Sequence, residues 1–305
     1  MIGLLQADCS NLMSSGSRTA GQLSKPLPTV DLLAPESCLL YSLYMILQQG
    51  DPIVAISQPS HSWLSGQLAR VWGNDQFNPF EPFEPICLAA EQHDVGFLGW
   101  EREPVLDPQT GLPYNFDCLP EAMHFDLWAR GISELKPVCW YSALIVSLHF
   151  CDLCQRFHHA SAKDPKSAAT RFLREQTRFQ ETAVAQLSRD PELKSAVTTE
   201  LLEFHRALLG VWDFLSLQLC RGRADHFRVP AVPLEANKSC DMTVRVRPNR
   251  IVEVDPWPFQ AESFDGQCEA RILKGPFVDE AQMRSGLEES DQIMLVFHFA
   301  PAKAD

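Results

Sequence analysis

The sequence lacks two features that would point to a membrane or to nucleic acid. No apolar run approaches the ~18 residues that a membrane-spanning helix needs. No basic excess exists either: 26 Lys and Arg stand against 39 Asp and Glu, and the net charge of −13 repels phosphate backbones. A basic amphipathic stretch for an anionic membrane surface is missing as well. These absences favour a cytoplasmic protein that has neither a membrane nor nucleic acid as its partner.

The cysteines support neither a zinc ribbon nor a disulfide framework. The ten cysteines are scattered along 305 residues, and several lie inside apolar runs. That distribution is typical of reduced, buried thiols. Cys151 and Cys154 form one CxxC motif, whereas a zinc ribbon needs a second such pair. We therefore interpret the cysteines as packing residues.

Three regions of different character follow one another along the chain. Residues 1–34 are rich in Ser, Gly and Pro and lack a clear secretion signal, so they predict a flexible tail. Residues 35–222 predict a helical body with a β-hairpin within 38–57 at its start. Residues 223–305 carry alternating and β-branched segments and predict a β-rich region packed on that body. The expected fold is mainly α, with a small antiparallel sheet as an appendage (α+β overall).

Capping and turn signals divide the body into helices. Ser60 can cap the first helix, and Gly222 can end the last one. Prolines at two helix starts suit the first turn, where their missing N–H costs nothing. The predicted helices cover residues 60–72, 84–95, 120–132, 137–157, 165–188 and 191–221. Strands are predicted over 241–248, 250–259, 267–273 and 293–301, with a short helix over 279–290.

Histidines recur on four successive predicted helices, at positions 61, 93, 124 and 149. A transition metal needs several nitrogen and oxygen donors that converge on one point, and a helical bundle provides them when each helix points a donor inward. Asp213 lies in the apolar segment LLGVWDFLSL. A buried carboxylate without a partner costs several kcal/mol, and a cation would stabilise it. The alternatives are an ordinary core position for each histidine, and exposure or a hydrogen-bond donor for Asp213.

The adjacent pair His93-Asp94 completes an order of residues that resembles the HD superfamily of metal-dependent hydrolases. In that superfamily a His is followed by a His-Asp pair, by two further histidines in two-metal members, and by a later Asp. The resemblance implies an HD-like helical bundle with a dinuclear metal centre. One ion would be held by His61, His93, Asp94 and Asp213; the second would be held by His124 and His149, with Asp94 bridging.

A second resemblance is carried by longer stretches of the chain. The segments SQPSHSWLSGQLARVWGN, CLAAEQHDVGFLGWE and LDPQTGLPYNF are similar to a bacterial family known only as a domain of unknown function. This resemblance covers roughly residues 38–300. It implies no established activity.

The expected activity is hydrolysis of a small phosphomonoester or phosphodiester at a divalent transition-metal site. The His and Asp donors suit Fe, Mn, Zn, Co or Ni. Asp94 and His124 would act at the reacting centre, and Arg130 would meet the substrate phosphate, with Arg70 or Arg102 as weaker candidates. His205, eight residues before Asp213, could support the ligands from behind.

Two other functions stay open at this point. Some two-iron proteins of the HD fold are oxygenases, and the donor series resembles theirs. They tend to carry a Lys near the ligands, whereas Val95, Gly96, Phe97 and Leu98 follow the His-Asp pair here. The third alternative is a non-catalytic, metal-stabilised binding or scaffold protein.

Overall fold

The computed structural model describes residues 45–48, 50–114 and 120–303. The predicted tail, residues 1–34, lies outside the described residues. Residues 41–305 form one compact unit. The segments expected as a helical body and as a C-terminal β region therefore belong to the same unit.

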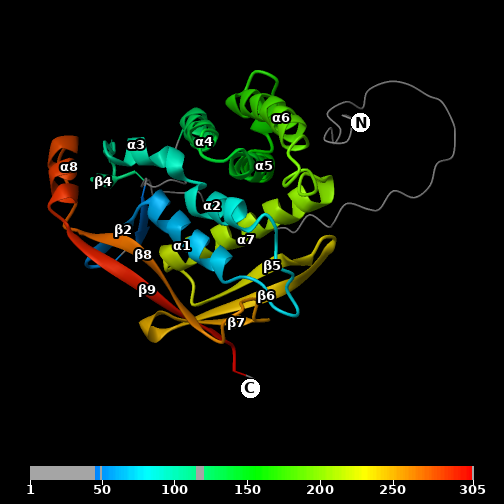
Figure 1. Cartoon of the computed structure of the whole chain (residues 1–305). Helices are drawn as coiled ribbons and strands as arrows, with labels where there is room; N and C mark the ends of the chain where they lie inside the picture. Colours follow the sequence, from blue (N-terminus) through cyan, green and yellow to red (C-terminus); the bar gives the residue numbers. More distant parts are fainter. Residues whose placement is uncertain (1–44, 49, 115–119, 304–305) are drawn as a thin grey trace. The chain divides into compact units, whose positions relative to one another are not determined.

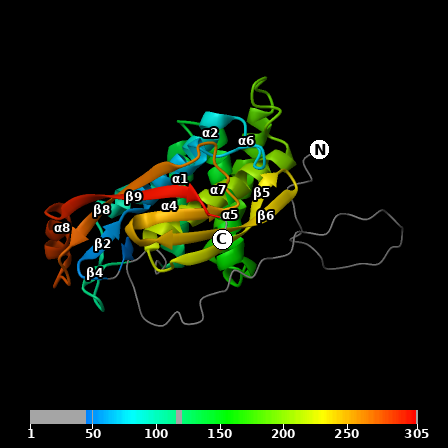
Figure 2. The same cartoon turned by 90° about the horizontal axis from the view of Figure 1, so that it is seen from below.

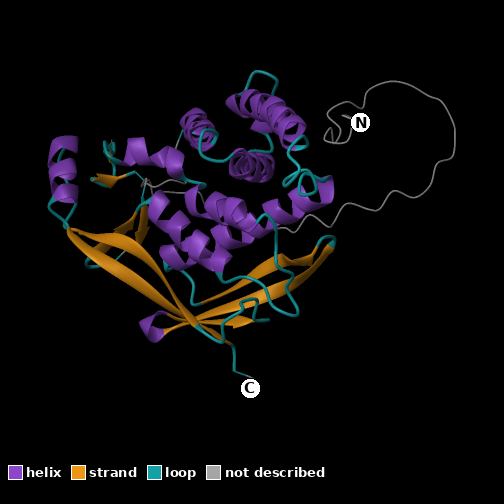
Figure 3. Cartoon of the chain, in the orientation of Figure 1, coloured by secondary structure: helices purple, strands orange, loops and turns teal. Residues whose placement is uncertain are grey.

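The expectation of a mainly α fold is wrong. About 48% of the described residues are helical and 23% are in strands, and seven of the strands build one large mixed sheet that curls into a half-barrel. Figure 3 shows this sheet as a broad layer on which the helices lie. The prediction failed because alternation along each strand shows which side chains face the core, whereas the size of a sheet depends on which strands pair.

The sheet has seven strands, in the order β1-β2-β8-β9-β7-β6-β5. Their bounds are Ile46–Gln48 (β1), Ile53–Ile56 (β2), Phe264–Leu273 (β8), Asp291–Pro301 (β9), Ile251–Asp255 (β7), Lys238–Arg247 (β6) and His226–Glu235 (β5). All neighbours are antiparallel except β7 and β9, which run parallel. Two short strands, β3 (Leu106–Asp107) and β4 (Leu112–Pro113), pair separately.

The N-terminal hairpin joins the sheet through β8, where Ile53 faces Leu273. Along β9 every second side chain is buried, including Leu295, Phe297 and Phe299. Because burial repeats every two residues, one face of the sheet packs toward the helices. Figure 2, seen from below, shows β9, β6 and β5 in front of the helices.

The helices predicted between residues 60 and 221 are all present, with shifted ends. Their bounds are Gln58–Arg70 (α1), Phe83–Gln92 (α2), Glu121–Leu135 (α4), Trp140–Phe157 (α5), Ala168–Leu187 (α6) and Thr199–Arg221 (α7). The structure adds the unpredicted α3 (Leu98–Glu101), and α8 (Glu280–Glu288) lies within the short helix predicted over 279–290. Short 3-10 turns cover Val95–Phe97 (η1), Ser161–Lys163 (η3) and Pro248–Arg250 (η4). Figure 1 shows their arrangement.

Helix caps explain where the two central helices begin and end. The Ser57 side chain accepts a hydrogen bond from the Ser60 N–H, so α1 starts earlier than the predicted Ser60 cap. Thr198 caps α7 in the same way. Gly222 then ends α7 with a left-handed φ of 59°, a conformation that glycine adopts without steric cost.

One hydrophobic core spans helices and sheet, so the expected all-helical core is also wrong. Trp72 and Trp212 pack edge to face at its centre, with ring centroids 5.8 Å apart. Val244 from β6 and Phe299 from β9 belong to the same cluster. Both α1 and α7 contact the sheet, α1 through β8 and α7 through β5. The sheet thus supports the two helices that carry His61 and Asp213.

Two further findings concern the membrane and the cysteines. Among the described residues, no helix has the length and apolar character that a membrane span requires. The described cysteines, Cys151 and Cys154 among them, are free thiols.

Candidate metal centre

Four helical segments bring five of the six predicted ligands together. His61 lies on α1, His93 ends α2, Asp94 begins η1, His149 lies on α5 and Asp213 on α7. The three histidine side chains are at most 1% exposed, whereas the Asp94 and Asp213 side chains are 8% and 14% exposed. The open side of the cluster is therefore the side of its carboxylates.

Several distances between donor atoms are close to those around a single ion, whereas His61 Nε2 lies 3.9 Å from Asp213 Oδ1. His61 Nε2 lies 2.8 Å from Asp94 Oδ2, and His93 Nε2 lies 3.4 Å from the same oxygen. Asp213 places Oδ1 3.4 Å from His93 Nε2 and Oδ2 3.2 Å from His149 Nε2. Metal–ligand bonds of about 2.1 Å at tetrahedral or octahedral angles separate neighbouring ligands by about 3.0–3.4 Å. The candidate ligand atoms of His61, His93 and Asp94 all lie within 4.8 Å of one another.

Unpartnered nitrogens face this cluster. His93 Nδ1–H donates to the Ala90 carbonyl at 2.9 Å, whereas its Nε2 has no hydrogen-bond partner. Both ring nitrogens of His149 also lack a partner, because the approach of Nε2 to Asp213 lacks hydrogen-bond geometry. Buried polar atoms are normally bonded, so these orphans need an explanation. A cation at the centre of the cluster would supply it for the Nε2 atoms of His93 and His149, whereas His149 Nδ1 lies on another edge of its ring.

The pKa values describe how the metal-free cluster balances its charges. Burial lowers the pKa of His93, but the charges of Asp94 and Asp213 outweigh burial and raise that pKa to about 9. Burial would raise the pKa of Asp213, yet contacts with His149 and His93 hold it well below the usual range. Burial lowers the pKa of His149. In the metal-free protein, protonated His93 therefore offsets the negative charges of the two carboxylates. A bound metal cation would take over this role.

His124, the sixth predicted ligand, is not brought into this cluster. Its ring packs on Trp128 with centroids 4.3 Å apart and lies 6.1 Å from the His158 ring. Burial, followed by the charge of His158, lowers the pKa of His124 to about 4, while Asp94 opposes the shift. His124 is near enough to feel the charge of Asp94, but its described neighbours are aromatic.

The arginines proposed for substrate phosphate lie on the surface. The Arg130 side chain is 53% exposed, and its Nε lies 3.5 Å from Glu134. Arg70 pairs with Glu84 at 3.0 Å and with Glu91 at 3.3 Å. A role of Arg130 in substrate binding stays a prediction.

Two other histidines have partners of their own. His205 Nδ1 lies 2.8 Å from the Tyr141 hydroxyl, which in turn donates to the Ala196 carbonyl. His205 thus links α7 to α5 and is hydrogen-bonded away from the predicted ligands. His158 is 23% exposed, and its Nδ1 lies 3.0 Å from Glu121 Oε1.

Sequence reasoning missed two polar residues beside the centre. Gln58 lies one helical turn before His61, and its buried side-chain oxygen has no hydrogen-bond partner. The Gln58 backbone N–H donates to Glu101 Oε1 at 2.8 Å. Burial and the nearby charge of Asp94 raise the pKa of Glu101 to about 8, against the effect of that hydrogen bond. No sequence signal marks Glu101, because it lies in the polar run WEREP, which is typical of a surface.

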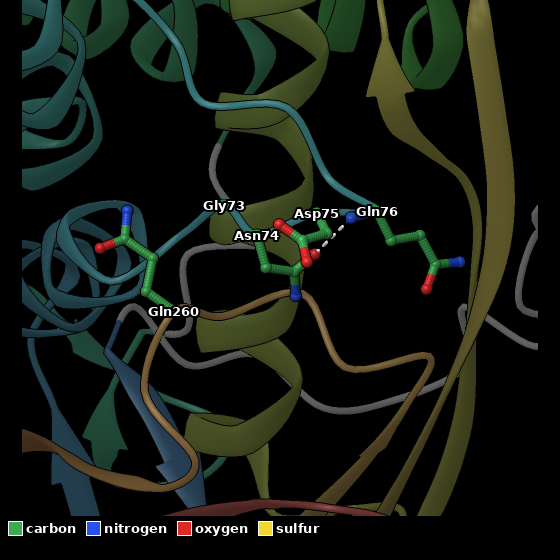
Figure 4. Close-up of a pocket in the computed structure, with 5 residues that line it drawn as sticks. All are labelled: Gly73, Asn74, Asp75, Gln76 and Gln260. Atoms are coloured by element: carbon green, nitrogen blue, oxygen red, sulfur yellow. Dashed lines mark hydrogen bonds between the residues drawn. The ribbon is translucent and has the colours of Figure 1, made fainter.

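An open pocket elsewhere contains none of the predicted ligands. Figure 4 shows it in the loop after α1, with a volume of about 460 Å³. Its lining consists of Gly73, Asn74, Asp75, Gln76 and Gln260. Asn74 uses its side-chain oxygen to accept the N–H groups of Gln76 and Phe77. Through these contacts the Asn74 side chain forms a local turn that stabilises the loop.

Comparison with known proteins assigns a family but no reaction. Residues 45–275 match the family described as "Protein of unknown function (DUF3891)", and this range contains all six predicted ligands. No curated protein and no solved structure matches the chain. Neither the family description nor any other match supports membership of the HD superfamily. Because the match covers more than half of the chain, the protein belongs to the DUF3891 family.

Proposed function

We propose that this protein is a metal-dependent phosphohydrolase whose centre is formed by His61, His93, Asp94, His149 and Asp213. The observation that carries the proposal is the convergence of buried, unpartnered imidazole nitrogens with two carboxylates. Such a set is costly to bury without a cation, since each unpaired polar atom forfeits its hydration. The order of these residues in the chain also resembles that of HD-type hydrolases.

The donor set indicates the kind of metal. Imidazole nitrogens with carboxylate oxygens suit Fe, Mn, Zn, Co or Ni. A divalent ion held here would lower the pKa of a coordinated water toward ~7 and offset negative charge on a phosphoryl group. The geometry favours one ion at the five-residue cluster. The second ion expected from the sequence would require His124, whose ring packs on Trp128.

The protein's own groups would supply orientation and a proton. The histidines are buried, whereas Asp94 and Asp213 retain some exposure, so water and substrate would approach from the carboxylate side. In the metal-free protein Glu101, with its pKa raised to about 8, holds a proton at neutral pH. We assign it the role of proton donor to the leaving oxygen, a step that an alkoxide leaving group needs. The buried side-chain oxygen of Gln58 would accept a hydrogen bond from the same part of the substrate.

The first experiment measures metal content. We expect about one transition-metal ion per chain in the purified protein and a loss of at least tenfold in His93→Ala and Asp213→Ala, because each removes a donor. His298→Ala is the matched control, since the His298 side chain is 51% exposed and pairs with Asp265 on the sheet. Wild-type metal content in both ligand variants, when circular dichroism shows them folded, would contradict the centre.

The second experiment tests the reaction. Manganese-loaded protein should release nitrophenol from nitrophenyl phosphate or bis-nitrophenyl phosphate, and Glu101→Gln should slow the release while metal content stays unchanged. Oxygen consumption by the ferrous protein without phosphatase activity would favour an oxygenase. Full metal loading with neither activity would overturn the enzymatic proposal.

A further inference from the structure

A pair of buried serines stands directly behind His61. Ser216 Oγ lies 3.0 Å from His61 Nδ1, on the ring edge opposite Asp94. Ser216 is three residues after Asp213 on α7, and its hydroxyl also lies 2.9 Å from the Asp213 carbonyl. Ser65, one turn after His61 on α1, places its Oγ 2.7 Å from Ser216 Oγ. Both serines are fully buried, so no solvent can replace these contacts.

Counting protons gives Ser216 two possible hydrogen-bond states. A hydroxyl donates one proton and accepts through its lone pairs. In one state the Ser216 hydroxyl donates to His61 Nδ1, so Nε2 carries the proton and donates to Asp94 Oδ2 at 2.8 Å. In the other state Ser216 donates to the Asp213 carbonyl and accepts from His61 Nδ1–H, which leaves Nε2 bare. The same heavy-atom positions fit both states.

His93 has no such freedom. Its Nδ1 faces the Ala90 carbonyl, which can only accept, so neutral His93 carries its proton on Nδ1. The centre therefore combines one histidine whose tautomer is fixed by a carbonyl with another whose tautomer depends on a hydroxyl that can turn. Only the Nδ1–H tautomer of His61 presents Nε2 to an ion.

We infer that Ser216 is a positioning residue that lets His61 exchange between a tautomer bonded to Asp94 and a tautomer that binds metal. The inference rests on the proposed metal centre. Without an ion, the Nε2–H···Asp94 bond satisfies both side chains. With an ion, rotation of the Ser216 hydroxyl toward the Asp213 carbonyl provides the acceptor for Nδ1–H. The single Ser65 hydroxyl proton can go either to Ser216 Oγ or to the Trp212 carbonyl at 3.3 Å.

The test compares Ser216→Ala with Ser147→Ala. Ser147 is equally buried, but its hydroxyl bonds Gln176 and Gln180 between α5 and α6. Cobalt titration is monitored by calorimetry and by visible absorption. Ser216→Ala should bind cobalt 10–100-fold more weakly than the wild type and show an altered d–d spectrum. Ser147→Ala should bind cobalt like the wild type. Wild-type affinity and spectrum in Ser216→Ala would overturn the inference.

A second measurement does not depend on any variant. Nitrogen-15 NMR of the wild-type protein should assign the Nε2–H tautomer to His61 in the metal-free state and the Nδ1–H tautomer with zinc. Any other pair of states overturns the inference. If wild-type protein binds neither cobalt nor zinc, the metal centre itself fails. If it binds them and only the serine results disagree, the metal centre stands without the proposed role of Ser216.

Discussion

Metal binding should release a proton from His93. The pKa of His93 is raised to about 9 because Asp94 and Asp213 outweigh the effect of burial, so its imidazole is protonated at pH 7 in the metal-free protein. A histidine must be neutral to bind a metal. Displacing its proton at pH 7, about two units below that pKa, costs about 2.7 kcal/mol and weakens binding about 100-fold.

The sign of the pH dependence follows from the raised pKa. Below pH ~9 His93 holds its proton, so apparent affinity should increase about tenfold for each pH unit between 7 and 9 and level off above that. In the unloaded protein the stabilisation from protonated His93 is complete below pH ~6.5 and is lost as pH rises through ~9. Added metal should therefore raise the melting temperature more at pH 9 than at pH 6.5.

Calorimetry in two buffers with different ionisation enthalpies measures the proton count directly. We expect about one proton released per zinc ion at pH 7, and less as the pH approaches 9. His298→Ala should release the same number, because His298 lies on the exposed side of β9. Zinc binding without proton release at pH 7 would refute the charge balance derived for His93.

Two further predictions concern Glu101 and the glycines after Asp94. Glu101 keeps its proton in the folded protein up to pH ~8 but loses it near 4.5 in the unfolded chain, so this group's contribution to stability falls as pH rises between those values. The melting temperature of Glu101→Gln should equal that of the wild type at pH 4.5 and exceed it at pH 9. The same difference in melting temperature at both pH values would contradict the raised pKa of Glu101. Gly96→Ala should cost about 1–3 kcal/mol in chemical denaturation, because its Cβ would approach the Leu127 carbonyl oxygen to 2.1 Å. Gly99→Ala meets only the end of the Arg130 side chain at 3.0 Å and should change stability by less than about 0.5 kcal/mol; a loss as large as that of Gly96→Ala would contradict the packing argument.

Local signals in the sequence were sufficient for the helices and for most of the candidate ligands. Capping side chains and a left-handed glycine act within a few residues, so α7 could be placed from its own sequence up to Gly222. The spacing of His61, the His93-Asp94 pair and Asp213 put one donor segment on each helix, and helix packing then brought them within contact distance. Burial of one apolar face of each helix turns such donors inward.

Contacts between distant segments needed the tertiary structure. The parallel pairing of Ile251–Asp255 with Asp291–Pro301, and the joining of Ile53 to Leu273, depend on strand register that alternation alone does not encode. The environment of His124 was partly hidden, since Trp128 lies on the same helix but Phe97 and His158 come from other segments.

The polar groups around the ligands could likewise be identified only from the tertiary structure. Glu101 looks like a surface residue in sequence, and Ser216 looks like an ordinary helix residue. Burial raises the pKa of Glu101, and the packing of α1 against α7 sets Ser216 against the His61 ring. The sequence by itself therefore determined which side chains are able to bind a metal. Only the fold decided which of them converge and what stands behind them, because those properties depend on distances between residues far apart in the chain.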